Sequence, residues 1–180
     1  MAEIQAIAAT ASNCDNNGGI KYSYGTDATN ITAVTVTSGA ISGFTMSSVG
    51  LWSKLEFDDD DNTASFNQEG ARNGSSIEFT QDATFQFNGL SQAKVTAANN
   101  AKACCGTVFI HFTYEGTAYV QGIEVDTSGD WSLTKDKARV IPAANTGTAD
   151  ENVILIYNVN STSRYVAPTT TLTEAAIEAL

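Results

Sequence analysis

Residues 77–87 (IEFTQDATFQF) alternate apolar and polar side chains almost without interruption. Successive side chains of a strand point to opposite faces, so this pattern predicts a long β-strand with one buried face. Residues 107–114 (TVFIHFTY) and 118–125 (AYVQGIEV) are joined by residues 115–117 (EGT) and predict a hairpin with a glycine turn. Between the long strand and this hairpin, residues 91–102 are Ala-rich, contain no Gly or Pro, and predict one short helix.

The rest of the chain reads as further short strands separated by turns. Residues 30–37 (NITAVTVT) alternate cleanly and are β-branched at most positions, and residues 153–159 (VILIYNV) form a continuous apolar run typical of a central strand. The remaining predicted strands are 20–24, 40–46, 51–57, 64–69 and 131–133, and we expect 64–69 to pair with 51–57 as a hairpin. The sequence therefore predicts one all-β domain over residues 1–180, a sandwich or small barrel with one packed helix. We expect a flexible N-terminal segment at about 1–17 and a flexible C-terminal tail at about 168–180.

Charge and length narrow the functional classes. The 180 residues contain 9 Lys and Arg against 20 Asp and Glu, a net charge of −11. Phosphate binding depends on clustered cations, so such a chain is not expected to grip nucleic acid, although it can face nucleic acid without binding it. The N-terminal residues have no basic region followed by an apolar core, and no apolar run reaches the roughly 20 residues of a membrane-spanning helix. We therefore expect synthesis and folding in a cytoplasm, with no membrane partner.

Residues with reactive or metal-binding side chains are few. Cys14, Cys104 and Cys105 are odd in number, and no paired His or CxxC accompanies them, so we interpret them as reduced apolar residues. A bridge from Cys14 to one of the adjacent pair remains open. The single histidine, His111, lies mid-strand on the face opposite Ile110 and Phe112, and we interpret it as a surface or interface residue.

The acidic run at residues 58–61 (DDDD) offers the oxygen ligands that Ca²⁺ prefers, with Asp58 and Asp60 as candidate ligands. The run lacks the spaced carboxylates and distal Glu of a calcium loop, so a solvated turn is the preferred interpretation. No Gly-x-Ser-x-Gly elbow and no phosphate-binding Gly-rich loop is present. We predict no catalytic residue, no cofactor and no metal, and expect that the protein is not an enzyme.

The order of elements resembles a bacteriophage tail tube protein, a group related in fold to the type VI secretion tube protein. Three stretches carry the resemblance: the strand that feeds a short helix at 79–91, the hairpin from Val108 to Ile123, and residues 146–152 (TGTADEN) leading into the apolar strand 153–157. They cover roughly the C-terminal two-thirds of the chain. The acidic run 58–61 has no counterpart in the family pattern.

The resemblance implies a structural virion protein, assembled in the host cytoplasm and located in the phage tail. Subunits of this family form hexameric rings that share an inner barrel, and the rings stack into a tube that conducts DNA during ejection without binding it specifically. The partners implied are other copies of the chain and other phage tail proteins. The strand Ile77 to Phe87 and the hairpin Thr107 to Val125 are the candidate barrel walls. The candidate barrel and ring interface residues are Ile77, Phe79, Phe85, Phe87, Phe109, Phe112, Tyr119 and Ile123. The candidate inter-ring contacts are Asp58, Asp59, Asp60 and Asp61, together with the N-terminal segment and the C-terminal tail.

Two alternatives stay open. One is another virion component, a capsid decoration protein or a head–tail adaptor ring. The other is a β-sandwich module that binds carbohydrate or Ca²⁺. An enzyme that depends on His111 or Glu124 comes last, because no constellation of catalytic side chains accompanies either residue.

Overall fold

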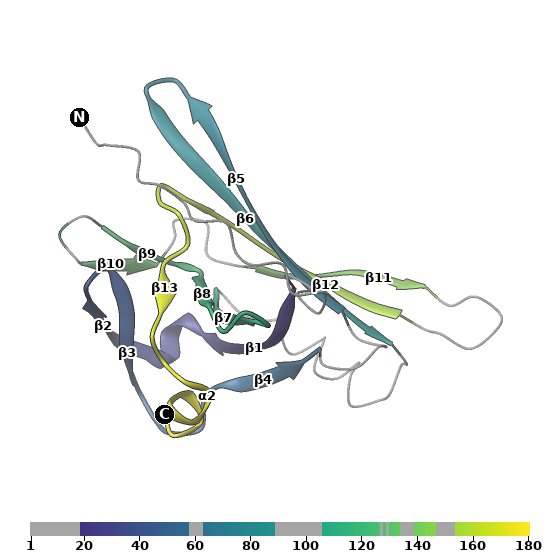
Figure 1. Cartoon of the computed structure of the whole chain (residues 1–180). Coiled ribbons are helices and arrows are strands. Elements are labelled where there is room, and N and C mark those ends of the chain that lie inside the picture. Colours follow the sequence, from purple (N-terminus) through teal and green to yellow (C-terminus); the bar gives the residue numbers. More distant parts are fainter. Residues whose placement is uncertain are drawn as a thin grey trace.

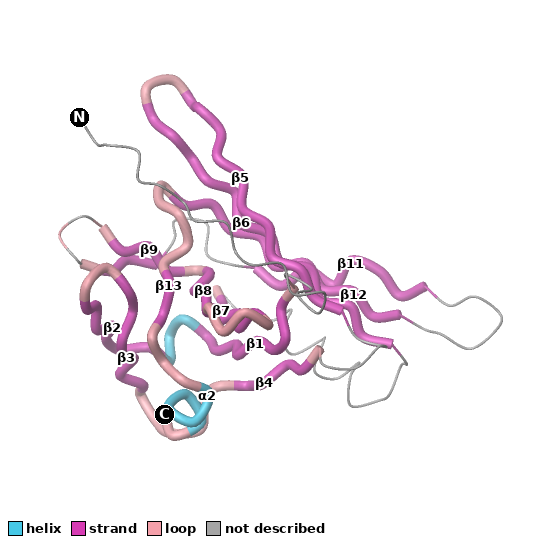
Figure 2. Tube along the Cα trace, viewed as in Figure 1, coloured by secondary structure: helices cyan, strands magenta, loops and turns pink. Residues whose placement is uncertain are grey.

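The computed structural model describes residues 19–57, 63–88, 106–126, 128, 130–133, 139–146 and 154–180. In these ranges nearly every element is a strand (Figures 1 and 2). The all-β class predicted from the sequence is confirmed. The elements, in chain order, are β1 (Ile20–Asp27), the 3-10 turn η1 (Ala28–Asn30), β2 (Ile31–Thr37), β3 (Ala40–Met46), β4 (Ser53–Glu56), β5 (Thr63–Asn73), β6 (Ser76–Asn88), β7 (Thr107–Thr113), β8 (Ala118–Gln121), β9 (Ile123–Val125), β10 (Trp131–Leu133), β11 (Arg139–Thr146), β12 (Ile154–Ser163), β13 (Thr169–Thr170) and the helix α2 (Glu174–Glu178).

The described strands form three sheets. The seven-stranded sheet has the order β2-β3-β13-β8-β7-β1-β4, the four-stranded sheet has the order β11-β12-β6-β5, and β9 pairs with β10 alone. All pairs are antiparallel except β3 with β13, which is parallel. Figure 1 shows β5 and β6 as a long ribbon that crosses the seven-stranded sheet and projects beyond it.

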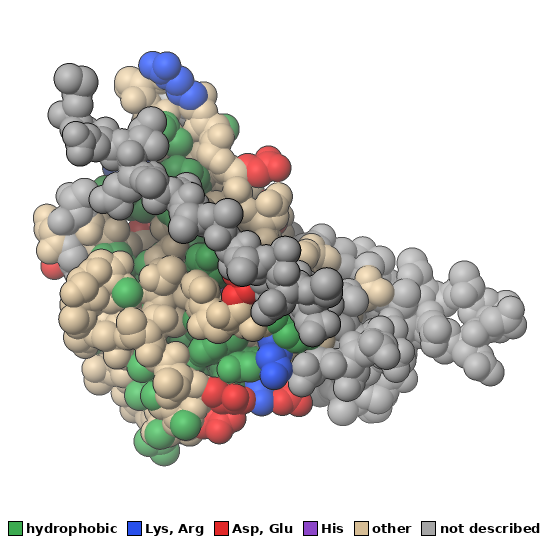
Figure 3. All heavy atoms as spheres, viewed as in Figure 1, with side chains coloured by type: hydrophobic (Ala, Val, Ile, Leu, Met, Phe, Trp, Pro, Cys, Tyr) green, Lys and Arg blue, Asp and Glu red, His purple; other side chains and the backbone are tan. Residues whose placement is uncertain are grey.

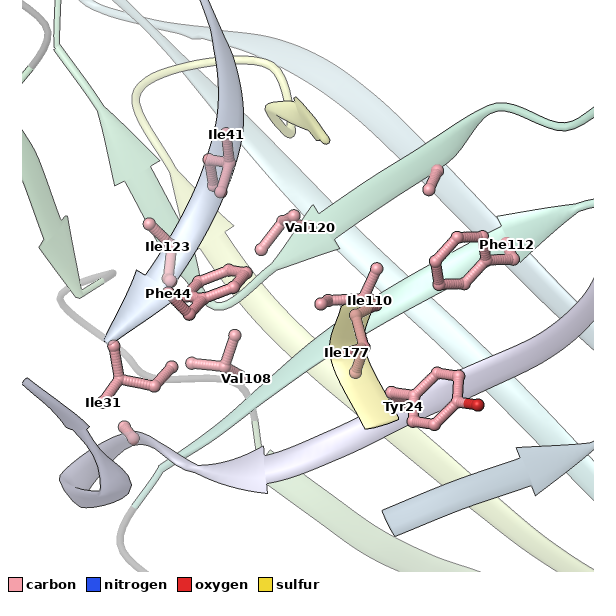
Figure 4. Packing of buried hydrophobic residues seen from close by; sticks show 12 residues of the cluster. Tyr24, Ile31, Ile41, Phe44, Val108, Ile110, Phe112, Val120, Ile123 and Ile177 are labelled. Carbon is pink, nitrogen blue, oxygen red and sulfur yellow. The ribbon is translucent and has the colours of Figure 1, made fainter. Parts of the chain in front are cut away.

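The seven-stranded sheet is curled, because residues from both of its ends meet in one apolar cluster. Ile31 and Phe44 from the β2–β3 end pack with Tyr24 and Ile110 from the other end of the sheet. Ile177 of α2 enters the same cluster with only 1% of its surface exposed, so the helix covers the open side of the curl (Figure 4).

A second cluster joins the seven-stranded sheet to the four-stranded sheet. Phe109 of β7 and Ile20 of β1 pack against Phe85 of β6 and Val159 of β12. The rings of Phe85 and Phe109 lie 5.5 Å apart. The two sheets therefore pack face to face, and this cluster fixes the side of the four-stranded sheet that is turned inward.

Strand β7 is covered on both faces. Its residues 108–112 are all buried, with Val108, Ile110 and Phe112 in the first cluster and Phe109 in the second. The predicted hairpin of β7 with β8 is confirmed, and its turn places Gly116 at φ +82°. A strand without a free face has no surface for a lumen, so β7 does not fit the role of a barrel wall.

One predicted pairing is wrong. Residues 64–69 were expected to pair with 51–57, but β5 pairs with β6 along its whole length, and β4 pairs with β1. The turn that joins β5 to β6 has Gly74 at φ +65°, a conformation that glycine adopts without strain. The predicted strand 77–87 is confirmed as β6, and the described part of the apolar run 153–159, from Ile154 on, lies in the inner strand β12.

The C-terminal residues expected to form a flexible tail are packed in the structure. Thr170 of β13 pairs with Ile41 on one side and Ala118 on the other, and Thr171 N donates to Ile41 O at 2.9 Å. Thr173 then caps α2, because its hydroxyl accepts from the backbone of Ala176. The predicted helix 91–102 and the N-terminal segment 1–17 lie outside the described residues.

Candidate functional site

The four-stranded sheet has two faces of opposite character, which follow from its register. On the inward face, Phe66 pairs with Ala83, and Ala83 with Val159, in the row that packs on the seven-stranded sheet. The outward face carries the alternate residues of the same strands. Its described side chains are Ser65, Asn67, Glu69 and Ala71 of β5, Glu78, Thr80, Asp82, Thr84 and Gln86 of β6, and Asn160 and Thr162 of β12.

The outward face is polar and acidic. Three of its side chains are carboxylates, Glu69, Glu78 and Asp82, and none of the described ones on this face is Lys or Arg. Arg139 pairs in register with Asn160, but its side chain is not among those described. Such a face repels phosphate groups rather than binding them.

Asp82 lies in the middle of this face, between Asn67 of β5 and Asn160 of β12. Burial raises the pKa of its carboxyl, and the nearby charge of Glu69 raises it further. Its Oδ1 is buried and accepts no hydrogen bond from the described residues. The row Asn67–Asp82–Asn160 is therefore a tightly spaced polar strip across three strands.

The same sheet ends in strands with unpaired edges among the described residues. Strand β5 pairs only with β6, and β11 pairs only with β12. An edge of 11 residues such as β5 presents a row of free backbone donors and acceptors, which invites pairing with another strand. The sheet thus has one face covered, one polar face, and two edges available for pairing.

A buried polar network holds the two sheets in register. His111 of β7 is fully buried; its Nδ1 lies 3.0 Å from Ser23 Oγ and its Nε2 lies 2.9 Å from Gln121 Oε1. Gln121 Nε2 crosses to the other sheet, where it donates to Gln81 O and Val159 O, both at 2.9 Å. The network therefore links β1, β7 and β8 to β6 and β12.

The network fixes the tautomer of His111. Gln121 Nε2 is turned toward two backbone carbonyls, so Gln121 Oε1 is the acceptor that faces the imidazole. His111 Nε2 must then carry the proton, and Nδ1 accepts from the Ser23 hydroxyl. Burial lowers the pKa of His111 to about 4, with the hydrogen bond to Gln121 opposing the shift, so the ring is neutral at physiological pH.

The interpretation of His111 as a surface or interface residue is wrong. The alternation placed it correctly on the face opposite Ile110 and Phe112, but the four-stranded sheet covers that face, and the ring packs 5.0 Å from the ring of Phe66. Ser23 and Gln121 are also fully buried. A substrate does not reach the buried Ser23 hydroxyl, so Ser23 does not serve as a nucleophile here. Its hydrogen bond with His111 is structural.

A cavity of about 320 Å³ lies between β5 and the β7–β8 hairpin. Phe66 and Tyr119 stack at one side of it with their ring centroids 6.0 Å apart. Glu115 is the one carboxylate among its lining residues. Glycoside hydrolysis needs a pair of carboxyl groups, so this cavity does not supply that chemistry from its own lining.

At the far end of the curled sheet, polar contacts hold α2 in place. Tyr24 Oη donates to Glu178 Oε1 at 2.8 Å and to Glu174 Oε1 at 3.2 Å, and Lys54 forms ion pairs with Glu56 and Glu174. Burial and these carboxylates raise the pKa of Tyr24, while the hydrogen bond from Lys54 lowers the pKa of Glu174. The helix is thus anchored by Ile177 beneath and by charged groups at its rim.

Four of the eight predicted interface residues lie inside the chain's own core. Phe85, Phe109, Phe112 and Ile123 are each at most 7% exposed, so they are not available to another subunit. Their predicted role at a ring interface is therefore corrected: they hold the sheets of a single copy together. Ile77 is exposed, and Phe79 and Tyr119 are half-buried. The side chain of Phe87 lies outside those described.

Several predicted sites fall outside the described residues: the acidic run Asp58 to Asp61, with the candidate calcium ligands Asp58 and Asp60, and the cysteines Cys14, Cys104 and Cys105. Within the part of the chain that the structure describes, no three His, Cys, Asp or Glu side chains gather as a metal site would need. None of the helices in that part is long and apolar enough to cross a membrane.

The sequence did contain a signal for the buried network that the prediction missed. Gln81 occupies the same face of β6 as Phe79, Ala83 and Phe85, so it is a polar residue inside an apolar series. Such a residue is buried only when it has hydrogen-bond partners. Gln81 meets that condition through Gln68 Oε1 at 3.2 Å and Ser161 Oγ at 3.3 Å.

Comparison with known proteins identifies no relative of this chain. No family model, no curated protein and no solved structure matches this chain.

Proposed function

We propose that the chain is a structural subunit that assembles with copies of itself into closed rings, and that the rings stack into a tube. In this proposal the four-stranded sheet forms the wall of a shared barrel. The tube is the tail tube of a bacteriophage, as the sequence resemblance implies, with hexameric rings and DNA as the passing cargo.

One observation carries the proposal: the four-stranded sheet is covered on one face, polar and acidic on the other, and unpaired at both edges among the described strands. Pairing the β5 edge of one copy with the β11 edge of the next removes both edges, and closure of the ring leaves none. The outward face then faces the bore. Glu69, Glu78 and Asp82 give it negative charge, which suits a channel through which DNA slides.

The first experiment is electron microscopy of the concentrated protein at moderate salt, together with native mass spectrometry. Hollow tubes of stacked rings are the expected result. A homogeneous monomer under all assembly conditions would overturn the proposal and favour a carbohydrate- or Ca²⁺-binding module. Single rings that never stack would favour a head–tail adaptor, and discrete trimers a decoration protein.

A second experiment tests which face lines the bore. Ser65→Lys with Thr80→Lys adds cations to two exposed positions on the outward face. Tubes of this variant are expected to retain double-stranded DNA in a salt-dependent manner, whereas wild-type tubes do not. Thr32→Lys with Thr35→Lys adds the same charge to exposed positions of β2 and serves as the control. Equal DNA retention by both variants would contradict the assignment of the face.

A further inference from the structure

The β5–β6 ribbon overhangs the rest of the molecule. Strand β12 pairs with β6 only as far as Ser163 opposite Phe79, so beyond that point β6 has β5 as its single described neighbour. The described side chains from Glu69 to Glu78 are all exposed. Figure 1 shows this end of the ribbon, which we name the hairpin tip (residues 69–78), projecting beyond the seven-stranded sheet.

The hairpin tip has one cationic, apolar face. Arg72 and Ile77 are direct cross-strand partners on the side that continues the inward face of the sheet, and Ile77 is 57% exposed. Next to them, the ring of Phe79 lies across Gly70, where a β-carbon would approach it to 3.0 Å. An isolated two-stranded ribbon is only marginally stable in water, so a projecting one with an exposed Ile fits a role in contact with a partner.

The opposite end of the molecule has the complementary character. We name it the base, defined by Val49 in the β3–β4 connection, Glu56 of β4, and Glu174 and Glu178 of α2. Val49 is 80% exposed, and the side chains of Glu56 and Glu174 are 65% and 37% exposed. Lys54 pairs with Glu56 and Glu174, and Glu178 adds a third carboxylate to the residues that define the base.

Figure 1 places α2 and the β3–β4 connection at the end of the molecule opposite the β5–β6 turn. Figure 3 shows acidic side chains next to basic ones at that end, and a basic side chain at the far end of the ribbon with an acidic one farther down. Complementary surfaces at opposite ends of one subunit fit a head-to-tail contact, which does not close on itself and so repeats into a filament.

We propose that the hairpin tip of one copy docks on the base of the next copy along the tube, with Ile77 against Val49 and Arg72 among Glu56, Glu174 and Glu178. This inference rests on the proposed self-assembly and names the surfaces that stack. The pairing of β5 with β11 closes each ring, and the tip-to-base contact joins one ring to the next.

Two double variants test the docking. Arg72→Glu with Ile77→Asp disables the tip, and Val49→Asp with Glu56→Lys disables the base; the four positions are exposed, so the fold is expected to survive, as thermal unfolding will check. Each variant is expected to form rings but to need at least about tenfold more protein to form tubes. An equimolar mixture of the two variants is expected to form pairs of rings and no longer stacks. The intact tips of the base variant can dock only on the intact bases of the tip variant. Val166→Asp, at another exposed valine, is the control. Tubes of wild-type length from the tip variant would overturn the proposal.

A photo-crosslinking residue at position 77 separates this inference from the proposed function. Cross-links to residues 47–56 or 174–178 of a second copy are expected, mapped by mass spectrometry. Cross-links to other surfaces, or none at up to about 1 mM protein, would overturn the docking. If the wild type forms no rings, the proposed function fails. The cross-linking result still decides whether the hairpin tip of one copy contacts the base of another.

Discussion

His111 Nε2 lies 2.9 Å from Gln121 Oε1, and this contact joins the imidazole to a side chain whose amide nitrogen is held by the opposite sheet. Because Gln121 donates to carbonyls of β6 and β12, the imidazole on β7 is coupled to the backbone of the opposite sheet. The position of the four-stranded sheet, and with it the candidate bore surface, therefore depends on a neutral histidine.

Acidification is expected to destabilise the fold through His111. Its pKa is about 4 in the folded protein against 6.5 as the ordinary value. Because the folded-state pKa is the lower one, this stabilisation is complete above pH 6.5 and is lost as the pH falls toward 4, about 3 kcal/mol in all. Urea unfolding across this range measures the loss.

The variant His111→Leu separates this effect from the titration of carboxylates. It is expected to be less stable than the wild type at neutral pH, and the difference between the two free energies of unfolding is expected to narrow by about 3 kcal/mol between about pH 7 and pH 4. A gap that stays constant would show that His111 does not remain neutral in the folded protein.

Gln121→Leu is expected to destabilise the protein by about 2–5 kcal/mol, because the carbonyls of Gln81 and Val159 and the Nε2–H of His111 lose their partner while buried. Denaturant unfolding gives the value. Gln86→Leu on the outward face of β6 is the matched control, with an expected change within about 0.5 kcal/mol. Equal effects of the two substitutions would mean that the network does not join the sheets.

Gly25→Ala is expected to cost about 1–3 kcal/mol, since the added methyl group would lie 2.7 Å from Cε1 of the buried Phe109 ring. Gly43→Ala is the control in another strand of the same sheet. There the nearest atoms are those of Thr35 at 3.5 and 3.6 Å, so the substitution is expected to be neutral or stabilising by up to about 1 kcal/mol. The melting temperatures of both variants decide the comparison, and the reverse order would contradict it.

Ile177→Ala is expected to reduce the free energy of unfolding by about 2–5 kcal/mol, because it leaves a cavity under α2 in the main apolar cluster. Val166→Ala removes an exposed side chain and is expected to change the value by less than about 0.5 kcal/mol. Hydrogen exchange at residues 174–178 gives a second readout, with faster exchange expected in the Ile177 variant. Unchanged exchange and stability would show that the helix is not held by this side chain.

Periodicity alone predicts much of this fold. The alternation in residues 77–87 and the glycine turn at 115–117 suffice for β6 and for the β7–β8 hairpin, since both are local features. Alternation says which face a residue occupies, not which strand pairs with it. The pairing of β5 with β6 depends on the turn at Gly74, and the acidic run at 58–61 misleadingly suggested a shorter hairpin with β4.

The candidate site is harder to predict, because it depends on contacts between distant parts of the chain. Nothing near His111 in the sequence indicates that a second sheet covers its face, and its partner Ser23 is 88 residues away. The polar outward face follows from the register once the inward face is known. Knowing which of the two faces packs on the other sheet requires the whole topology.

The position of β13 has a consequence for how the protein folds. This strand is the hydrogen-bonded link between β3 and β8. Strands β2 and β3 therefore have no backbone hydrogen bonds to the β8-β7-β1-β4 part of the seven-stranded sheet until residues 168–171 are in place. Completion of the seven-stranded sheet is therefore a late step of folding, because it requires β13 to pair with both β3 and β8.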